Sequence, residues 1–297
     1  MAAPSRRPVV DQPGGRSERD EHVHAQVARL RDLESGRRAW PAVVALGHSA
    51  LPGLEEVLRG RSEVVSQPRR LAAAAIGAIG GAAAQQALRR ALRDCLERPL
   101  DPILRLAEDE VVAEIADALV VHAGPDDAEA LLAALQRRAN AGCARALGSL
   151  RTAAAVPVLV QCLSDATAAD AAAEALRSIG SPAVPSLTAA ALLPVLQGEY
   201  EGATSARKRA RAVKLLGEIG GPATDLPLAV ALCDTDRDVR FSAALALAVR
   251  HGGGPAAIPV LLEALADERW LVALEAEAAL SALAGELLLR GVRARER

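Results

Sequence analysis

The chain has very few aromatic residues. They make up 1% of its 297 residues and are Trp40, Tyr200, Phe241 and Trp270. Hydrophobic residues nevertheless account for 51% of the chain, so a core has to be built from Ala, Leu, Val and Ile. Because small side chains let helices approach closely, this composition favours short, densely packed helices over a broad sheet.

Cysteine pairs, net charge and long apolar runs are also lacking. The four cysteines, Cys95, Cys143, Cys162 and Cys233, are scattered and form no CxxC motif, which indicates a reducing cytoplasm. A formal net charge of −2 gives no overall attraction to nucleic acid or to an anionic membrane. No run of about 18 apolar residues predicts a membrane span, and no apolar segment near Met1 predicts a secretory signal.

Motifs for catalysis or for cofactor binding are missing too. The sequence contains no GxGxxG before a strand, no Walker-type loop and no HExxH. His22 and His24 stand two residues apart, so they would diverge on a helix rather than share a metal. Serine and cysteine nucleophiles have no identifiable partners. We therefore expect no catalytic residue, no metal ligand and no cofactor.

What the chain does have is one pattern that recurs along it. Small, small, apolar and apolar residues occupy positions i, i+3, i+4 and i+7, and copies follow each other at spacings of 28 to 43 residues. Self-similarity at this period is typical of solenoids built from stacked helical units. The third positions of the eight copies are Leu46, Ile76, Leu119, Leu147, Leu176, Leu216, Leu247 and Leu280.

A second helix is expected after each copy of the pattern. Several apolar segments carry a proline near their start, at Pro157, Pro185, Pro227 and Pro259. A helix tolerates proline in its first turn, where backbone N–H groups have no intrahelical partner. The expected segments are a disordered tail (residues 1–19), a capping helix (residues 20–36), the solenoid (residues 37–291) and a charged C-terminal tail (residues 292–297).

These residues carry a resemblance to the HEAT repeat. The run Arg209-x-x-Ala212-x-x-Leu215-Leu216-Gly217 resembles its first helix, and the run from Ala257 to Leu265 resembles its second. The short repeat is similar to the bacterial subclass described as phycobilisome-lyase-like HEAT repeats. The resemblance covers roughly residues 37–285 and implies an all-α, right-handed α-solenoid of about eight HEAT-like helical hairpins.

The resemblance also implies a polar ladder between neighbouring repeats, formed by an aspartate and an arginine of the first helix. The arginine position is filled by Arg69, Arg209 and Arg240. Other copies have Val112, Asn140, Ala169 or Ala273 in its place. We therefore expect a ladder that is interrupted along the chain.

A binding surface is expected in the last repeats. Arg207, Lys208 and Arg211 form a basic run, and residues 207 and 211 share a helix face opposite the apolar one, so the run should be exposed. Arginine and aromatic residues dominate binding interfaces, and further candidates of these kinds follow in the sequence. We predict that an acidic protein segment docks on these residues: Arg207, Lys208, Arg211, Arg237, Arg240, Phe241, Trp270 and, in an inserted loop, Tyr200.

Two alternatives concern this surface. Trp270 opens the last repeat, so it could either anchor a partner or pack as part of the C-terminal cap. The binding surface could also be the concave face of repeats 3 to 5 instead of the basic helix.

The sequence thus predicts a non-catalytic protein-binding scaffold or adaptor in the cytoplasm, with a curved repeat surface, no membrane or nucleic-acid partner, and an oligomeric state left open. Two other functions remain open. A bilin lyase or isomerase-like enzyme is suggested by the name of the repeat subclass. A nucleic-acid-binding protein of the HEAT-like kind would use the basic run, against the net charge.

Overall fold

The computed structural model of the protein describes residues 14–60, 65–98, 102–120, 123–196, 203–250 and 254–295. Within these ranges every regular element is a helix and no strand occurs. The prediction of an all-α solenoid is therefore confirmed. The chain divides into two compact units, residues 1–122 and 123–297, and each is described by itself.

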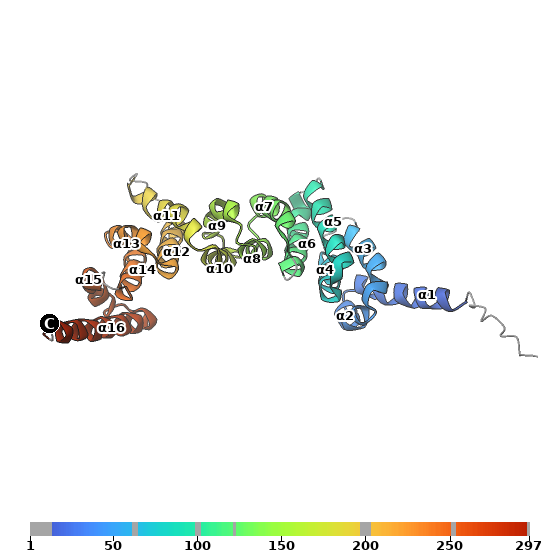
Figure 1. Cartoon of the computed structure of the whole chain (residues 1–297). Helices are drawn as coiled ribbons and strands as arrows, with labels where there is room; N and C mark the ends of the chain where they lie inside the picture. The colour runs from blue at the N-terminus through green and yellow to red at the C-terminus, as the bar shows by residue number, and fades with distance from the viewer. Residues whose placement is uncertain are drawn as a thin grey trace, which may run out of the picture. The chain divides into compact units, whose positions relative to one another are not determined.

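The first unit stacks helical hairpins behind an N-terminal helix (Figure 1). In it, α2 packs on α4, and α4 packs on α6. Fully buried aliphatic side chains such as Leu54, Ile76 and Ile115 form its core. Its helices are α1 (Gly14–Ala28), η1 (Arg29–Arg31), α2 (Gly36–Ala45), η2 (Gly47–Ala50), α3 (Leu51–Arg59), α4 (Gln67–Ile79), α5 (Gly81–Glu97) and α6 (Pro102–Val120).

The second unit continues the same plan. The first helices of its hairpins pack on one another, with α8 against α10 and α12 against α14. The last helix, α16, packs on α14 and α15 (Figure 1). The helices are η3 (Pro125–Asp127), α7 (Ala128–Arg137), α8 (Ala141–Ser149), η4 (Ala153–Ala155), α9 (Val156–Cys162), α10 (Ala169–Ile179), η5 (Ser181–Ala183), α11 (Val184–Leu196), α12 (Ala203–Ile219), η6 (Pro222–Thr224), α13 (Asp225–Ala231), α14 (Arg237–Ala248), α15 (Gly254–Ala264) and α16 (Trp270–Arg295).

The ends of the chain differ from the predicted segments. The helix α1 begins at Gly14, so the last part of the expected disordered tail over residues 1–19 is helical. Good helix formers such as Glu18 and Arg19 let the helix extend beyond its apolar stripe. At the other end, α16 runs to Arg295, so most of the expected tail over residues 292–297 belongs to it. The eighth copy of the pattern is thus one long helix rather than a hairpin.

The positions that the pattern predicts to be buried are buried inside the stack of helices, but not in the first copy of the pattern. The third positions from Ile76 to Leu247 are buried, whereas Leu280 at the far end is half-buried. In α2, Ala42 and Ala45 are exposed, and Ala39 and Val43 face the core instead. The same four-position pattern also fits the chain about one helical turn earlier, so periodicity alone could not choose between the two registers.

Close helix contacts depend on glycine meeting alanine. A Cβ added at Gly148 would lie 2.6 Å from Ala175 Cα, and one added at Gly217 would lie 2.4 Å from Ala246 Cβ. Ala175 and Ala246 are 2% and 9% exposed, which confirms the prediction that both pack tightly between helices. In the first unit, Gly77 of α4 meets Ala118 of α6 in the same way, at 2.7 Å.

The four thiols differ sharply in burial, and this gives a first prediction. Cys95, Cys143 and Cys162 are buried, whereas Cys233 is exposed. Burial raises the pKa of the Cys95 thiol to about 12 and that of Cys162 to about 11. Because the thiolate is the nucleophile, we expect iodoacetamide at mildly alkaline pH to modify Cys233 alone in the folded chain and all four cysteines in urea. Peptide mass spectrometry measures this, and rapid native labelling of Cys143 would contradict the packing of α8.

Candidate functional site

A groove of the second unit lies between its last helices. It has a volume of about 630 Å³, and we refer to it as the terminal groove. Its walls come from α14, from α15, from the segment between α15 and α16, and from the first turn of α16. The lining residues are Arg237, Asp238, Arg240, Phe241, Val260, Glu263, Ala264, Ala266, Asp267, Glu268, Arg269 and Val272.

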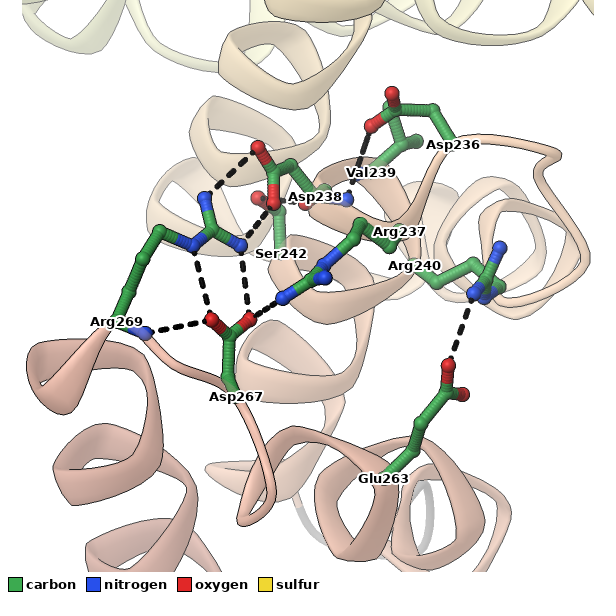
Figure 2. Close-up of polar contacts among 9 residues, drawn as sticks. All are labelled: Asp236, Arg237, Asp238, Val239, Arg240, Ser242, Glu263, Asp267 and Arg269. Atoms are coloured by element: carbon green, nitrogen blue, oxygen red, sulfur yellow. Dashed lines mark hydrogen bonds and ion pairs between the residues drawn. The ribbon is translucent and has the colours of Figure 1, made fainter.

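The start of α14 places the first wall of this groove. Asp236 is the N-cap, and its Oδ1 accepts hydrogen bonds from the backbone N–H groups of Asp238 and Val239, at 2.9 and 3.2 Å (Figure 2). Such a cap satisfies donors that the first turn of a helix leaves unpaired. Ser242 Oγ donates to the Asp238 carbonyl at 2.8 Å. The cap thus fixes Arg237 and Asp238 in the first turn, beside the groove.

A buried carboxylate connects the two walls. The side chain of Asp267 is 4% exposed and accepts hydrogen bonds from Arg237 and from Arg269, whose Nη2 lies 3.0 Å from Asp267 Oδ2 (Figure 2). Arg269 also reaches across to Asp238, with Nη2 2.6 Å from Oδ1 and Nη1 3.1 Å from Oδ2. Charge-assisted, two-pronged contacts of this kind fix the geometry of both partners.

The pairing with Arg269 also shifts acid–base equilibria. The hydrogen bond from Arg269 lowers the pKa of the Asp238 carboxyl from its usual value, more than partial burial raises it, and the charge of Arg237 adds to this. A lowered pKa in the folded state means that the pair stabilises the fold above the unfolded pKa of this carboxyl. That contribution is lost as the pH falls through the folded pKa. The pair of Asp238 and Arg269 is therefore charged near neutral pH.

Arg240 is held less completely. Its Nη1 donates to the carbonyls of Asp234 and Thr235, at 3.0 Å each. Its Nη2 lies 3.4 Å from Glu263 Oε1, and the Glu263 side chain is 67% exposed. The backbone contacts fix the position of the guanidinium, while the exposed carboxylate can give way to another anion.

Phe241 lies between two hollows. Besides the terminal groove, it lines a second one of about 370 Å³, formed by α12, α14 and Glu275 of α16. Its side chain is half-buried, so part of it stays accessible to a partner. Aromatic side chains held in this way are suited to anchoring a partner, because little rotamer freedom is lost on binding.

The structure separates the predicted site residues into groups. Arg237, Arg240 and Phe241 all line the terminal groove. Trp270 follows the groove in the sequence but does not line it, and it is 74% exposed. The alternative in which Trp270 packs as part of a C-terminal cap is therefore wrong. Tyr200 lies outside the described residues.

The basic run of α12 lies apart from the groove lining and is not uniformly free. Arg207 is exposed and Lys208 is half-buried. The expectation that Arg211 is simply exposed is wrong, because its Nη1 donates to the Leu163 carbonyl at 2.6 Å and its Nη2 lies 3.6 Å from Asp170. A long arginine side chain of α12 can reach the turn between α9 and α10, which helix periodicity alone does not reveal.

Sequence reasoning did not place Asp267, Arg269 and Glu263 in the site. A signal for Asp267 existed, since it recurs at the repeat position of Asp165 and Asp234, where an aspartate follows each second helix. All three accept hydrogen bonds from a backbone N–H two residues later. The pairing of Asp267 with two arginines depends on tertiary geometry, so the sequence contained no comparable signal for it.

The chemical groups of the groove are mainly charged side chains. The residues that line the groove include no serine, cysteine, histidine or lysine that could act as a nucleophile. Across the described ranges, no three His, Cys, Asp or Glu side chains are grouped to hold a metal ion. What the groove offers is three fixed guanidinium groups, four carboxylates and one aromatic ring.

Comparison with protein families identifies the repeats. The family model for HEAT repeats matches residues 192–281, which include both walls of the terminal groove, and the model for the PBS lyase HEAT-like repeat matches residues 140–165. The chain is a HEAT-repeat protein. The predicted resemblance, including the phycobilisome-lyase-like subclass, is thereby confirmed. No curated protein matches the chain significantly.

Solved structures with similar folds include two natural proteins and an engineered one. Human deoxyhypusine hydroxylase in complex with glycerol is 19% identical, with 92% of this chain and 100% of that one covered and a TM-score of 0.35. An engineered protein is 21% identical, with coverages of 88% and 78% and a TM-score of 0.44. The complex of CpcE and CpcF of phycocyanin lyase from Nostoc sp. PCC7120 is 18% identical, with coverages of 95% and 100% and a TM-score of 0.26. Similarity at this level transfers no activity or ligand to this HEAT-repeat protein.

Proposed function

We propose that this HEAT-repeat protein is a non-catalytic protein-binding scaffold whose terminal groove binds an acidic segment of a protein partner. The observation that carries the proposal is a groove of about 630 Å³ in which Arg237, Arg240, Arg269 and Phe241 converge. Arginine and aromatic side chains are the residue types that most often dominate binding energy at protein interfaces. None of the four cysteines forms a disulfide, which fits a reducing, cytoplasmic environment. Among the described residues, no helix has the length and apolar character needed to cross a membrane.

The guanidinium groups of the groove still have N–H donors that a partner can use. The side chains of Arg237 and Arg269 are 59% and 50% exposed although both contact Asp267. A guanidinium has more N–H donors than one carboxylate can accept. A partner carboxylate could therefore bind Arg237 or Arg269 beside Asp267 and displace the loosely held Glu263 from Arg240. The partner would gain charge-assisted hydrogen bonds without disturbing the buried part of the network.

The groove lacks the uncompensated positive charge that a nucleic-acid backbone requires, and it would bind a protein segment through individual arginine contacts instead of through net charge. Three arginines face four carboxylates, Asp238, Glu263, Asp267 and Glu268, so the lining residues carry no net positive charge. Phosphate recognition draws most of its affinity from uncompensated lysine and arginine. A salt-dependent mobility shift of nucleic acid by the chain would count against this argument.

The proposal predicts that two positions in the groove control partner capture. Phe241→Ala removes the aromatic anchor and Arg237→Ala removes an exposed guanidinium. An anchor of this kind contributes about 2 kcal/mol, or roughly thirtyfold in affinity. Proteins captured from native lysate by the immobilised parent chain are identified by mass spectrometry, and the affinity of each purified partner is then measured for parent and variants. We expect the affinity of an acidic partner to fall about thirtyfold for Phe241→Ala and to weaken with added salt.

Matched substitutions outside the groove serve as controls. Arg207→Ala and Lys208→Ala remove the same kind of charge from α12, and neither residue lines the groove. Both controls should keep the parent affinity, and thermal melts should show that every variant is folded. If the α12 variants lose the partner while Phe241→Ala keeps it, the basic helix is the binding surface. If all variants bind as the parent does, the partner binds elsewhere and the proposed site is wrong.

A further inference from the structure

The helix α16 has two apolar faces, and only one of them is covered. On one side Ala276 and Leu283 are 0% and 3% exposed and pack against the preceding hairpin. On the other side Trp270, Leu271 and Leu274 are 74%, 50% and 52% exposed. A helix that is apolar all round is normally buried all round. The second face therefore lacks the cover that its composition requires.

The uncovered face is continuous and free of charge. At about 3.6 residues per turn, its members fall on one side of the helix over roughly 22 Å of its length. The exposed residues Glu275 and Glu277 border the face on its two edges. We call this surface the outer face of α16. Its residues are Trp270, Leu271, Leu274, Ala278, Ser281, Ala282 and Gly285, and all of them are exposed.

The two halves of the outer face complement each other in size. Large side chains occupy its first half, and small residues occupy its second half, from Ala278 to Gly285. Gly285 stands in a helix, where glycine costs about 1 kcal/mol relative to alanine, yet no atom lies within 4 Å of a Cβ placed there. No contact among the described residues explains this glycine. A hollow at one end of a face and a bulky ridge at its other end are the features of a surface that fits a reversed copy of itself.

We propose that the outer face of α16 pairs with the same face of a second copy of this chain, in antiparallel orientation. With Ala278 at the twofold axis, Leu271 of one copy lies level with Gly285 of the other, and Leu274 lies level with Ala282. Large residues then meet small ones at both of these pairs, and the helices can approach closely there. The contact is isologous and closes at two subunits. A parallel pair would instead set Trp270 against Trp270.

Charge along the helix favours the same orientation. The exposed Glu268 precedes α16, whereas the sequence of its last turns carries Arg290, Arg293 and Arg295. Antiparallel pairing brings the acidic start of one helix level with the basic end of the other. In this arrangement the dipoles of the two helices run in opposite directions, which is electrostatically favourable. Parallel pairing would bring like charges together at both ends.

The pairing is tested by the mass of the full chain in solution and by two substitutions. Sedimentation equilibrium of the parent at micromolar concentration should give twice the chain mass of 30.7 kDa. Gly285→Leu fills the hollow and Leu274→Glu places a charge in the contact, and both positions are exposed in the single chain. Because each change occurs twice in a twofold contact, we expect either to raise the dissociation constant at least about thirtyfold. Leu262→Glu, at a residue of α15 that is 55% exposed, is the matched control and should leave the dimer intact.

Disulfide cross-linking tests the orientation. In a Cys233→Ser background, Ala278→Cys lies at the twofold axis and should form a disulfide with its own copy under mild oxidation. Leu274→Cys should not, because it faces Ala282. Efficient cross-linking of Leu274→Cys would show a parallel pair and overturn the antiparallel arrangement. A parent that stays monomeric throughout, or a dimer that tolerates both Gly285→Leu and Leu274→Glu, would overturn the proposal as a whole. It stands independently of the terminal groove, since none of these substitutions alters a residue that lines it.

Discussion

Replacing Arg209 with leucine should destabilise the second unit by about 3–5 kcal/mol, the usual effect of removing one partner from a buried ion pair. Arg209 and Asp234 have side chains 6% and 2% exposed. The guanidinium binds both carboxylate oxygens, with Nε 3.0 Å from Oδ2 and Nη2 3.2 Å from Oδ1. Without it, a buried charge is left unpaired beneath α12. Urea unfolding followed by circular dichroism measures the loss, and hydrogen exchange locates it in α12 and α13.

Two comparison variants separate burial from charge. Arg177→Leu removes an arginine that pairs with Glu218 at 2.8 Å, but these side chains are 48% and 32% exposed. Exposed pairs of this kind contribute about 0–1 kcal/mol, so this variant should unfold close to the parent. The double variant Arg209→Leu with Asp234→Leu removes both charges and should recover most of the lost stability. A single variant Arg209→Leu as stable as Arg177→Leu would contradict the buried pair.

The interrupted polar ladder shows what the sequence could predict about these arginines. The positions of Arg69, Arg209 and Arg240 were recognisable from the repeat. Arg69 pairs with buried Glu108 at 2.5 Å in the first unit, Arg209 with Asp234, and Arg240 with two backbone carbonyls. Equivalent positions therefore take different partners. The partner depends on which acceptor the neighbouring turn presents, and periodicity does not contain that information.

The fold was more predictable than the site for a similar reason. One repeated spacing determines which side of each helix is buried, and neighbouring copies reinforce one another. It fails only where a copy has no complete neighbour, as in α2, where Ala42 and Ala45 proved to be exposed. The terminal groove depends instead on Asp267 meeting Arg237 and Arg269 across a turn. Such contacts arise between repeats, and the charged residues involved are individually ordinary.

Glycines within the first helix of three hairpins indicate close helix contacts, although the four-position pattern does not include them. Gly77, Gly148 and Gly217 each follow the apolar third position of their copy. Each faces the second position of the next packed copy, which is alanine in every case. Helix propensity alone predicts that replacing these glycines with alanine is stabilising by about 1 kcal/mol. The packing distances predict the opposite sign.

Gly148→Ala should destabilise the second unit by about 3 kcal/mol, at the upper end of the range for overpacking. The added methyl would lie 2.6 Å from Ala175 Cα and 2.7 Å from Ala175 Cβ. Backbone cannot move aside as a flexible side chain can, so α8 and α10 would have to separate along their contact. Thermal and urea unfolding measure the loss. Gly53→Ala, where the nearest atom is a Val27 side-chain carbon at 3.4 Å, is the matched control and should show no comparable loss.

Exchanging the methyl group between helices distinguishes backbone crowding from side-chain crowding. At Gly217 the closest atom to an added methyl is Ala246 Cβ at 2.4 Å, and Ala246 Cα is farther away, at 3.3 Å. Gly217→Ala combined with Ala246→Gly therefore removes the worst clash and should return to within about 1 kcal/mol of the parent. Gly148→Ala combined with Ala175→Gly leaves Cα at 2.6 Å and should stay destabilised. Equal rescue at both sites would mean that α8 and α10 are packed less closely than the 2.6 Å distance to Ala175 Cα implies.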